Sequence, residues 1–323
     1  MIKRTTLLAA GLAALALSLH AADAPAAAPR KIVLGVVAKS QSNPVFQAAR
    51  LGAEAAAKDL SKKYNANITI DWRTPNDEDA QKQADNIAAL VNNGVTGIAV
   101  SASDANKVTP AINDAVNKGV PVVTFDSDAP ASKRFATYAV DDEKCGRQVM
   151  TELVKVMGEK GVVAILAGNQ NAPNLQKRVA GAKAVAAKYP NLKVNVYYNV
   201  ETPQDAAQKV EQVTQANPEI TGWAMIGGWP LFTKNALKFA PGTIKVVSVD
   251  ALPAELDYLR DGHVQMLLAQ QCYQWGYQGV SLLVDDIINK KRPAQAFVES
   301  ALIPVSKDNV EAFAKESASW FPK

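Results

Sequence analysis

The sequence predicts an α/β protein built on doubly wound parallel sheets. Strand-like and helix-like segments alternate along most of the chain, several strand candidates are continuous apolar runs, and Asn, Pro or Gly marks many helix ends. Continuous apolar runs are typical of strands covered on both faces, and repeated strand–helix units imply parallel strands with right-handed crossovers. There are more such units than one eight-stranded barrel holds. We therefore expect two open sheets.

The first half of the chain shows this alternation clearly. Residues 31–38 (KIVLGVVA) form an apolar, β-branched run, and Ser42-Asn43-Pro44 then opens an amphipathic segment that ends near Tyr64. Asn is a favoured N-cap and Pro suits the first helical position, so this segment is predicted to be a helix. Further strands are expected at 68–72, 97–100 and 120–125, and further helices at 77–92 and 105–118.

The alternation restarts after Asp141 with a helix that is expected to end at Met157. Strands separated by helical segments are then predicted at 162–166, 194–198, 223–226 and 244–249, followed by an apolar run at 266–269. Ligands of open parallel sheets bind beyond the carboxyl ends of the strands, so those ends are where a site is expected.

Short polar side chains and aromatic rings stand at these strand ends. Carboxylates and amides form paired hydrogen bonds with neighbouring hydroxyls, and aromatic rings pack on the apolar face of a pyranose, so this mixture indicates a sugar site. The candidates in chain order are Asn43, Phe46, Ser101, Asp126, Ser127, Asn174, Gln176, Trp229, Asp250 and Gln270.

Each candidate also has a purely structural interpretation. Asn43, Asp126 and Asp250 suit helix caps or turns, and Phe46 on a helical face is usually core. Trp229 follows two glycines, where backbone is exposed, which favours a binding role. The sugar prediction therefore rests on the whole set.

Composition disfavours several other classes of function. Lys plus Arg is 35 and Asp plus Glu is 31, with no basic run, so no nucleic-acid partner is expected. The two histidines (His20 and His263) and two cysteines (Cys145 and Cys272) are too few for common zinc or iron–sulfur sites. Dinucleotide, P-loop, nucleophile-elbow and zincin motifs are absent from the sequence. We predict a protein without enzymatic activity, catalytic residues, cofactor or metal.

Residues 1–24 are predicted to be a secretory signal peptide whose cleavage site stays open. Lys3 and Arg4 precede an apolar run at 7–17 that is too short to span a bilayer, and small residues follow it. An uncleaved membrane anchor is the alternative. Export would place the mature protein in the periplasm, where a disulfide between Cys145 and Cys272 is permissible.

Four segments follow the signal peptide in order: KIVLGVV, SNPVF, GVTGIAVSASD and PVVTFDSDAP. In this order they resemble the periplasmic sugar-binding proteins of ABC importers, in the branch that contains ribose-, galactose/glucose- and allose-binding proteins. The resemblance covers essentially the whole mature chain. It implies a type I periplasmic binding protein, in which two Rossmann-like lobes close on a sugar and are joined by a three-segment hinge.

The resemblance also implies the lobe boundaries and the ligand contacts. One lobe would hold residues 31–140 plus 271–303, and the other 141–270 plus 304–323, with the third crossing near Ile303–Pro304. In such proteins an asparagine and an aspartate, here Asn43 and Asp126, bind sugar hydroxyls, and an aromatic ring, here Phe46, stacks on the sugar. The other implied contacts are Ser101, Asp250 and Gln270. The N-x-x-x-R-x-x-G stretch is also implied to contact the sugar, and which of Asn174, Gln176 and Arg178 does so stays open.

Two departures from the family pattern leave the sugar unassigned. Ser127 stands where ribose-type proteins have arginine, and Gly227-Gly228-Trp229-Pro230 replaces an asparagine–aspartate pair. On the same resemblance the two cysteines belong to different lobes. Because a bridge between them would oppose closure, free thiols are favoured.

We expect a monomer that captures a monosaccharide, a hexose or pentose, and delivers it to an ABC permease in the inner membrane. The alternative is a receptor component that presents a sugar or autoinducer to a chemoreceptor or sensor kinase. A sugar-responsive repressor is disfavoured because a signal peptide stands where its DNA-binding helices would be. An exported enzyme is disfavoured by the scarcity of histidine and the absence of motifs.

Overall fold

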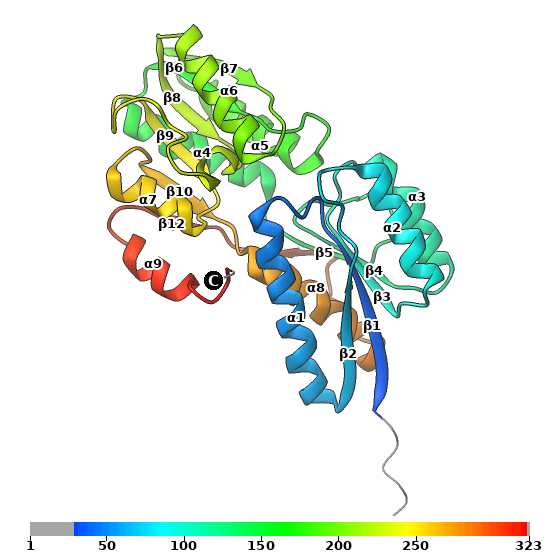
Figure 1. Cartoon of the computed structure of the whole chain (residues 1–323). Coiled ribbons are helices and arrows are strands. Elements are labelled where there is room, and N and C mark those ends of the chain that lie inside the picture. Colours follow the sequence, from blue (N-terminus) through cyan, green and yellow to red (C-terminus); the bar gives the residue numbers. More distant parts are fainter. Residues whose placement is uncertain (1–28, 322–323) are drawn as a thin grey trace, which may run out of the picture.

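The computed structural model describes residues 29–321, which form two six-stranded sheets with helices packed against them (Figure 1). The strand order is β11-β5-β4-β3-β1-β2 in the first sheet and β12-β10-β9-β8-β6-β7 in the second. All neighbouring strands are parallel except β10 and β12. The predicted α/β class with two open sheets is confirmed. The predicted signal peptide lies outside the described residues.

The first sheet and its helices, here called the first lobe, come from both ends of the described chain. Its strands are β1 (Arg30–Val37), β2 (Ala66–Trp72), β3 (Gly97–Val100), β4 (Val122–Phe125), β5 (Ala136–Ala139) and β11 (Phe297–Glu299). Its helices are α1 (Pro44–Tyr64), α2 (Ala80–Asn92), α3 (Ala105–Asn117) and α8 (Cys272–Asn289). Figure 1 shows α2 and α3 on one side of this sheet and α1 and α8 on the other, and each pair covers its own apolar cluster.

The second sheet and its helices form the second lobe. Its strands are β6 (Gly161–Leu166), β7 (Leu192–Tyr197), β8 (Ile220–Met225), β9 (Lys245–Val249), β10 (Met266–Ala269) and β12 (Ile303–Val305). Its helices are α4 (Asp142–Met157), α5 (Pro173–Ala186), α6 (Pro203–Ala216), the 3-10 turn η1 (Trp229–Phe232), α7 (Pro253–Asp261) and α9 (Val310–Ser317). None of the helices between residues 29 and 321 combines the length and apolarity needed to cross a membrane.

The chain passes between the two lobes three times in the described residues. The first passage joins β5 to α4, the second joins β10 to α8, and the third joins β11 to β12. Ile303 pairs with Ala269 of β10, so this residue already belongs to the second sheet. The third passage therefore lies at residues 300–302, slightly ahead of the expected Ile303–Pro304.

Glycines set the spacing of the helix pair that carries part of the site. A Cβ atom on Gly146 of α4 would overlap the backbone carbonyl of Arg178, and one on Gly181 of α5 would overlap that of Glu143. The two helices can approach this closely because neither glycine carries a side chain. This contact brings Asp142, at the start of α4, beside Arg178 of α5.

Candidate ligand-binding cleft

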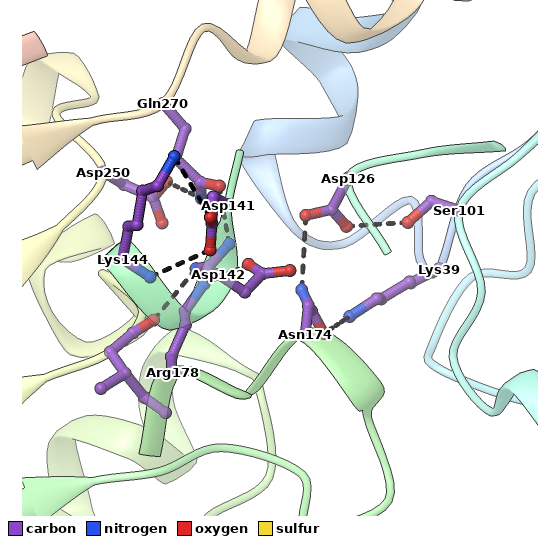
Figure 2. Close-up of polar contacts among 11 residues, drawn as sticks. Lys39, Ser101, Asp126, Asp141, Asp142, Lys144, Asn174, Arg178, Asp250 and Gln270 are labelled. Carbon is purple, nitrogen blue, oxygen red and sulfur yellow. Dashed lines mark hydrogen bonds and ion pairs between the residues drawn. The ribbon is translucent and has the colours of Figure 1, made fainter. Parts of the chain in front are cut away.

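Polar side chains from both lobes meet at the carboxyl ends of the parallel strands (Figure 2). Lys39 and Ser101 follow β1 and β3, and Asp126 and Asp250 directly follow β4 and β9. The end of a parallel strand leaves the next residues free of the strand ladder, so their side chains can face a ligand. The predicted location of the site is the place where these groups gather.

Asp126 is the central group of the first-lobe side. Its backbone is left-handed (φ 55°), and its N–H donates to the carbonyl of Tyr138 on β5 at 3.1 Å. Its carboxylate accepts from Ser101 Oγ at 2.8 Å and from Asn174 Nδ2 at 3.5 Å. These contacts hold the carboxylate toward the second lobe.

Asp250 lies on the second-lobe side. Its carboxylate accepts from Gln270 Nε2 at 2.8 Å and from the Gly228 N–H at 3.2 Å. Burial raises the pKa of this carboxyl group, while Gln270 and the charge of Arg178 act in the opposite direction. The result is a buried acceptor held by two neutral donors, with the charge of Arg178 nearby.

Arg178 ties the polar residues of the second lobe together. Its side chain is 2 % exposed and forms a buried ion pair with Asp142, Nε to Oδ1, at 2.8 Å. The guanidinium also donates to Gln270 Oε1 at 2.7 Å and to the carbonyl of Ile226 at 3.1 Å. Because Gln270 in turn donates to Asp250, the orientation of one side chain depends on the others.

Direct hydrogen bonds cross from one lobe to the other. Lys39 Nζ donates to Asn174 Oδ1 at 3.3 Å, and the Nδ2 of the same Asn174 side chain donates to Asp126. Farther along the cleft, Asn169 Nδ2 donates to Glu78 Oε1 at 3.3 Å. These hydrogen bonds hold polar side chains of the two lobes in direct contact.

Lys39 was absent from the residues that the sequence indicated. The lysine is 3 % exposed, although its side chain carries a full charge. Burial lowers its pKa, but the surrounding carboxylates of Glu201, Asp126 and Glu78 raise the pKa by more. Its place two residues after β1, at a strand end, is the signal that could have identified it.

Glu201 faces the same region from the second lobe. Its carboxylate accepts from the backbone N–H of Asn169 at 3.2 Å. Burial raises the pKa of Glu201 to about 7, although the nearby charge of Lys39 lowers it. A groove of about 740 Å³ opens beside Glu201, with walls that include Ser40 and Glu78 of the first lobe and Asn169 of the second.

Six of the residues indicated by sequence and resemblance lie in this hydrogen-bonded cluster, which consists of two groups. Ser101, Asp126 and Asn174 form one group, and Arg178, Gln270 and Asp250 form the other. Gln176 belongs to neither group, because its side chain is exposed and donates to the carbonyl of Gln170 at 2.7 Å. Within α5, Gln176 is two residues from Asn174 and from Arg178, so it points to another side of the helix.

The remaining candidates lie in more structural surroundings. Asn43 is buried and caps α1, with its Oδ1 accepting from the Val45 N–H at 3.1 Å. Phe46 is 2 % exposed and packs in the first-lobe core against Trp275, with ring centroids 6.2 Å apart. Ser127 is fully buried, and among the described residues its hydroxyl has no hydrogen-bond partner.

Trp229 is buried against two glycines of the second lobe. Its indole lies where a Cβ atom of Gly168 or Gly227 would stand, so the ring packs directly on their backbones. The ring is 4 % exposed. This packing explains the glycine at 227, whereas a Cβ atom on Gly228 would overlap Glu255 Oε1 instead.

The described residues hold no grouping of three or more His, Cys, Asp or Glu side chains arranged for a metal ion. Cys145 and Cys272 are both free and buried. Burial raises the pKa of the Cys145 thiol to about 12, so it stays protonated at neutral pH.

Comparisons with known proteins agree on one family. The family described as "Periplasmic binding protein domain" matches residues 34–291. The D-apiose import binding protein of Actinobacillus succinogenes is 29% identical over 71% of this chain and 72% of its own length. The ribose import binding protein RbsB of Bacillus subtilis is 24% identical over 81% and 84%.

A solved structure has the same fold over nearly its whole length. The chain superposes with a TM-score of 0.79 on an ABC transporter solute-binding protein from Burkholderia graminis that was crystallised with D-arabinose. The two are 27% identical, and the match covers 87% of this chain and 96% of the other.

Proposed function

This chain belongs to the periplasmic binding protein family, and from that premise we propose that it captures a monosaccharide between its lobes and delivers it to an ABC permease. The proposed ligand is a hexose or pentose. We further propose that the protein acts in the periplasm as a monomer and catalyses no reaction.

The observation that carries this proposal is the pair of carboxylates that follow equivalent strands of the two sheets. Asp126 and Asp250 offer acceptors, while Asn174, Arg178 and Gln270 offer amide and guanidinium donors beside them. A sugar hydroxyl both donates and accepts, so neighbouring hydroxyls can be bound by such mixed pairs. Groups from both lobes would then contact one ligand.

Ligand binding would also supply the energy for closure. A sugar that contacts both lobes has a higher affinity for the closed form than for the open form, so it shifts the population toward closure. The three passages between the lobes are the segments about which such a rotation can occur. The closed form would be the one that the permease recognises.

The relatives support transport rather than presentation to a sensor kinase. Two relatives are named as import binding proteins, one for D-apiose and one for ribose, and the solute-binding protein from Burkholderia graminis was crystallised with D-arabinose. These are sugars of five carbons, so pentoses stand first among the ligands to test. Asn43, Ser127 and Trp229 are proposed to shape the pocket around the central cluster.

A thermal-shift screen of the mature protein tests this proposal. The panel contains pentoses, hexoses, deoxy sugars, sugar alcohols and amino acids. A sugar present at about 100 times its dissociation constant should stabilise the protein by about 2.7 kcal/mol, which raises the melting temperature measurably. Titration calorimetry then measures the affinity for each sugar that raises the melting temperature. Stabilisation by an amino acid and by none of the sugars would contradict the proposed ligand class.

A further inference from the structure

We propose that the groove beside Glu201 binds a second sugar unit, joined by a glycosidic bond to the sugar held by the hydrogen-bonded cluster, so that the ligands include disaccharides as well as free monosaccharides. This inference rests on the proposed function, because it extends the class of ligand taken by the same cleft. The groove has a volume of about 740 Å³, within the range of about 300–1,000 Å³ that is typical of small-molecule sites. None of the six clustered residues lines it, so it is a separate place in the cleft.

The groove lies at the mouth of the cleft, away from the passages between the lobes. Those passages leave the first sheet from β5 and β11 and the second sheet from β10 and β12, near one edge of each sheet. The groove is lined instead by residues that follow β1 and β2 in the first lobe and β6 and β7 in the second, at the other edge. A substituent that leaves the bound sugar on the side opposite the passages would therefore enter the groove.

The groove adjoins the hydrogen-bonded cluster and has walls from both lobes. Ser40, in the first-lobe wall, directly follows Lys39, which donates to Asn174 of the cluster. Asn169, in the second-lobe wall, already joins the lobes through its hydrogen bond to Glu78 at 3.3 Å. A second sugar unit would contact both lobes at once, so it would favour the closed form together with the sugar in the cluster.

Two polar side chains in the groove wall have hydrogen-bonding capacity that the described part of the chain leaves unused. Ser40 is 7 % exposed, and its hydroxyl has no hydrogen-bond partner among residues 29–321. Glu201 accepts from the Asn169 N–H through Oε1, and within the same residues its second carboxylate oxygen has no partner. Because polar groups with little access to water are normally hydrogen-bonded, hydroxyls of a ligand in the groove would complete both groups.

The rest of the groove wall has the chemistry that recognises carbohydrate. Tyr198, directly after β7, is 47 % exposed and can pack its ring on the apolar face of a pyranose. Amide side chains around it both donate and accept, as neighbouring sugar hydroxyls require. They are Asn169, Gln170, Asn199, Gln208 and Gln212. A second sugar offers these amides donors and acceptors, whereas an apolar substituent offers neither.

The experiment compares monosaccharides with disaccharides by titration calorimetry. The monosaccharides are D-ribose, D-arabinose, D-xylose, D-glucose and D-galactose, and the disaccharides are xylobiose, maltose, cellobiose, lactose and melibiose. We expect the wild type to bind at least one disaccharide within about tenfold of its tightest monosaccharide, and native mass spectrometry to show that disaccharide intact in the complex. Tyr198→Ala should weaken the disaccharide at least about fivefold and the monosaccharide less than about twofold. Tyr277→Ala removes a ring on α8, outside the groove, and should leave both affinities near the wild-type values.

The outcomes separate the inference from the function on which it rests. If the wild type binds a monosaccharide but binds every disaccharide more than about tenfold more weakly, the second unit is overturned while the proposed function stands. The same holds if Tyr198→Ala weakens the disaccharide no more than the monosaccharide. If the wild type binds none of the sugars, the proposed function fails and the inference fails with it. Should Tyr198→Ala not fold, the double variant Gln208→Ala and Gln212→Ala, at exposed positions of α6, is judged by the same criteria.

Discussion

Asp126 and Asp250 occupy equivalent positions in the two sheets. Each directly follows the corresponding strand, β4 or β9, and each has a left-handed backbone, with φ of 55° and 76°. Each also donates its N–H to the neighbouring strand, to Tyr138 of β5 or to Leu268 of β10. Two aspartates in the same unusual conformation therefore face one cleft from opposite lobes.

Because the backbone at Asp126 is left-handed, Asp126→Ala and Asp126→Asn should differ in their free energy of unfolding. Asn tolerates this conformation and Ala does not, so Asp126→Ala should lose about 1–2 kcal/mol of unfolding free energy relative to Asp126→Asn. Both variants remove the carboxylate that accepts from Ser101 and Asn174, so both should lose detectable sugar binding. Urea denaturation measures the first effect and titration calorimetry the second.

Asp128→Asn provides the control for Asp126. Asp128 lies two residues farther along and accepts from Arg134 Nε at 2.7 Å, outside the hydrogen-bonded cluster. Sugar affinity in this variant should stay near the wild-type value. Wild-type affinity in Asp126→Asn would remove Asp126 from the binding site.

The contact between α4 and α5 should be intolerant of any side chain at Gly146. A methyl group there would overlap the backbone carbonyl of Arg178, which cannot move without shifting α5. We expect Gly146→Ala to lose about 3 kcal/mol of unfolding free energy, within the range for overpacked cores. Gly279→Ala is the matched control, because its added methyl would lie 3.6 Å from Ala99 Cβ at ordinary contact distance. Equal stability of the two variants in urea would contradict this packing.

Trp229 is predicted to contribute to stability as well as to binding. Trp229→Ala would remove a ring packed on Gly168 and Gly227 and should cost about 4 kcal/mol of unfolding free energy, as large buried aromatic truncations do. Because the ring borders the strand ends of the second lobe, affinity should weaken and selectivity among sugars should broaden. Unchanged selectivity in the folded variant would leave the ring with a packing role alone.

Glu255 should make stability depend on pH. Its carboxyl group is fully buried, accepts from the Leu252 N–H at 2.6 Å, and has a pKa well above the ordinary 4.5 because of burial and the nearby charge of Asp250. An acid with a raised folded-state pKa holds its proton while the unfolded chain releases it, so it lowers stability as pH rises above about 4.5. Glu255→Gln should remove this loss of stability at higher pH.

The gain from Glu255→Gln should therefore be larger at about pH 8 than at about pH 5, as measured by urea denaturation at both values. Glu311→Gln is the control, since its exposed carboxyl pairs with Arg260, which holds its pKa below the usual value. That substitution should bring no gain at the higher pH. A gain for Glu255→Gln that is independent of pH would show that the buried carboxyl is not protonated in the folded state.

The regular elements were predictable because their signals are local. Apolar runs and helix caps identified most strands and helices, including α1 with its Asn43 cap. No such signal marks β5, β11 and β12. β11 and β12 have three residues each, and β5 (ATYA) is not a continuous apolar run. These strands are defined by their partners in the sheet rather than by a repeating pattern.

The candidate site was predictable where a side chain follows a strand directly, as Asp126 and Asp250 do. Lys39 was missed because its burial depends on Asn174, which lies 135 residues away in the chain. The helical repeat could have separated the α5 candidates, since Asn174 and Arg178 are four residues apart and share a face that Gln176 does not.

The three passages between the lobes have a consequence for the order in which the protein can fold. A chain that emerges from its N-terminus completes β6 through β10 before it supplies α8, the partner against which Gly52 of α1 packs. The first lobe is thus the first to be synthesised, but it lacks α8 and the edge strand β11 until the second lobe is nearly complete. The main part of the second lobe, by contrast, is one uninterrupted stretch of 142–269. During synthesis the cluster under α2 and α3 is therefore available first, whereas the cluster between α1 and α8 can be buried only after residues 142–269 have been made.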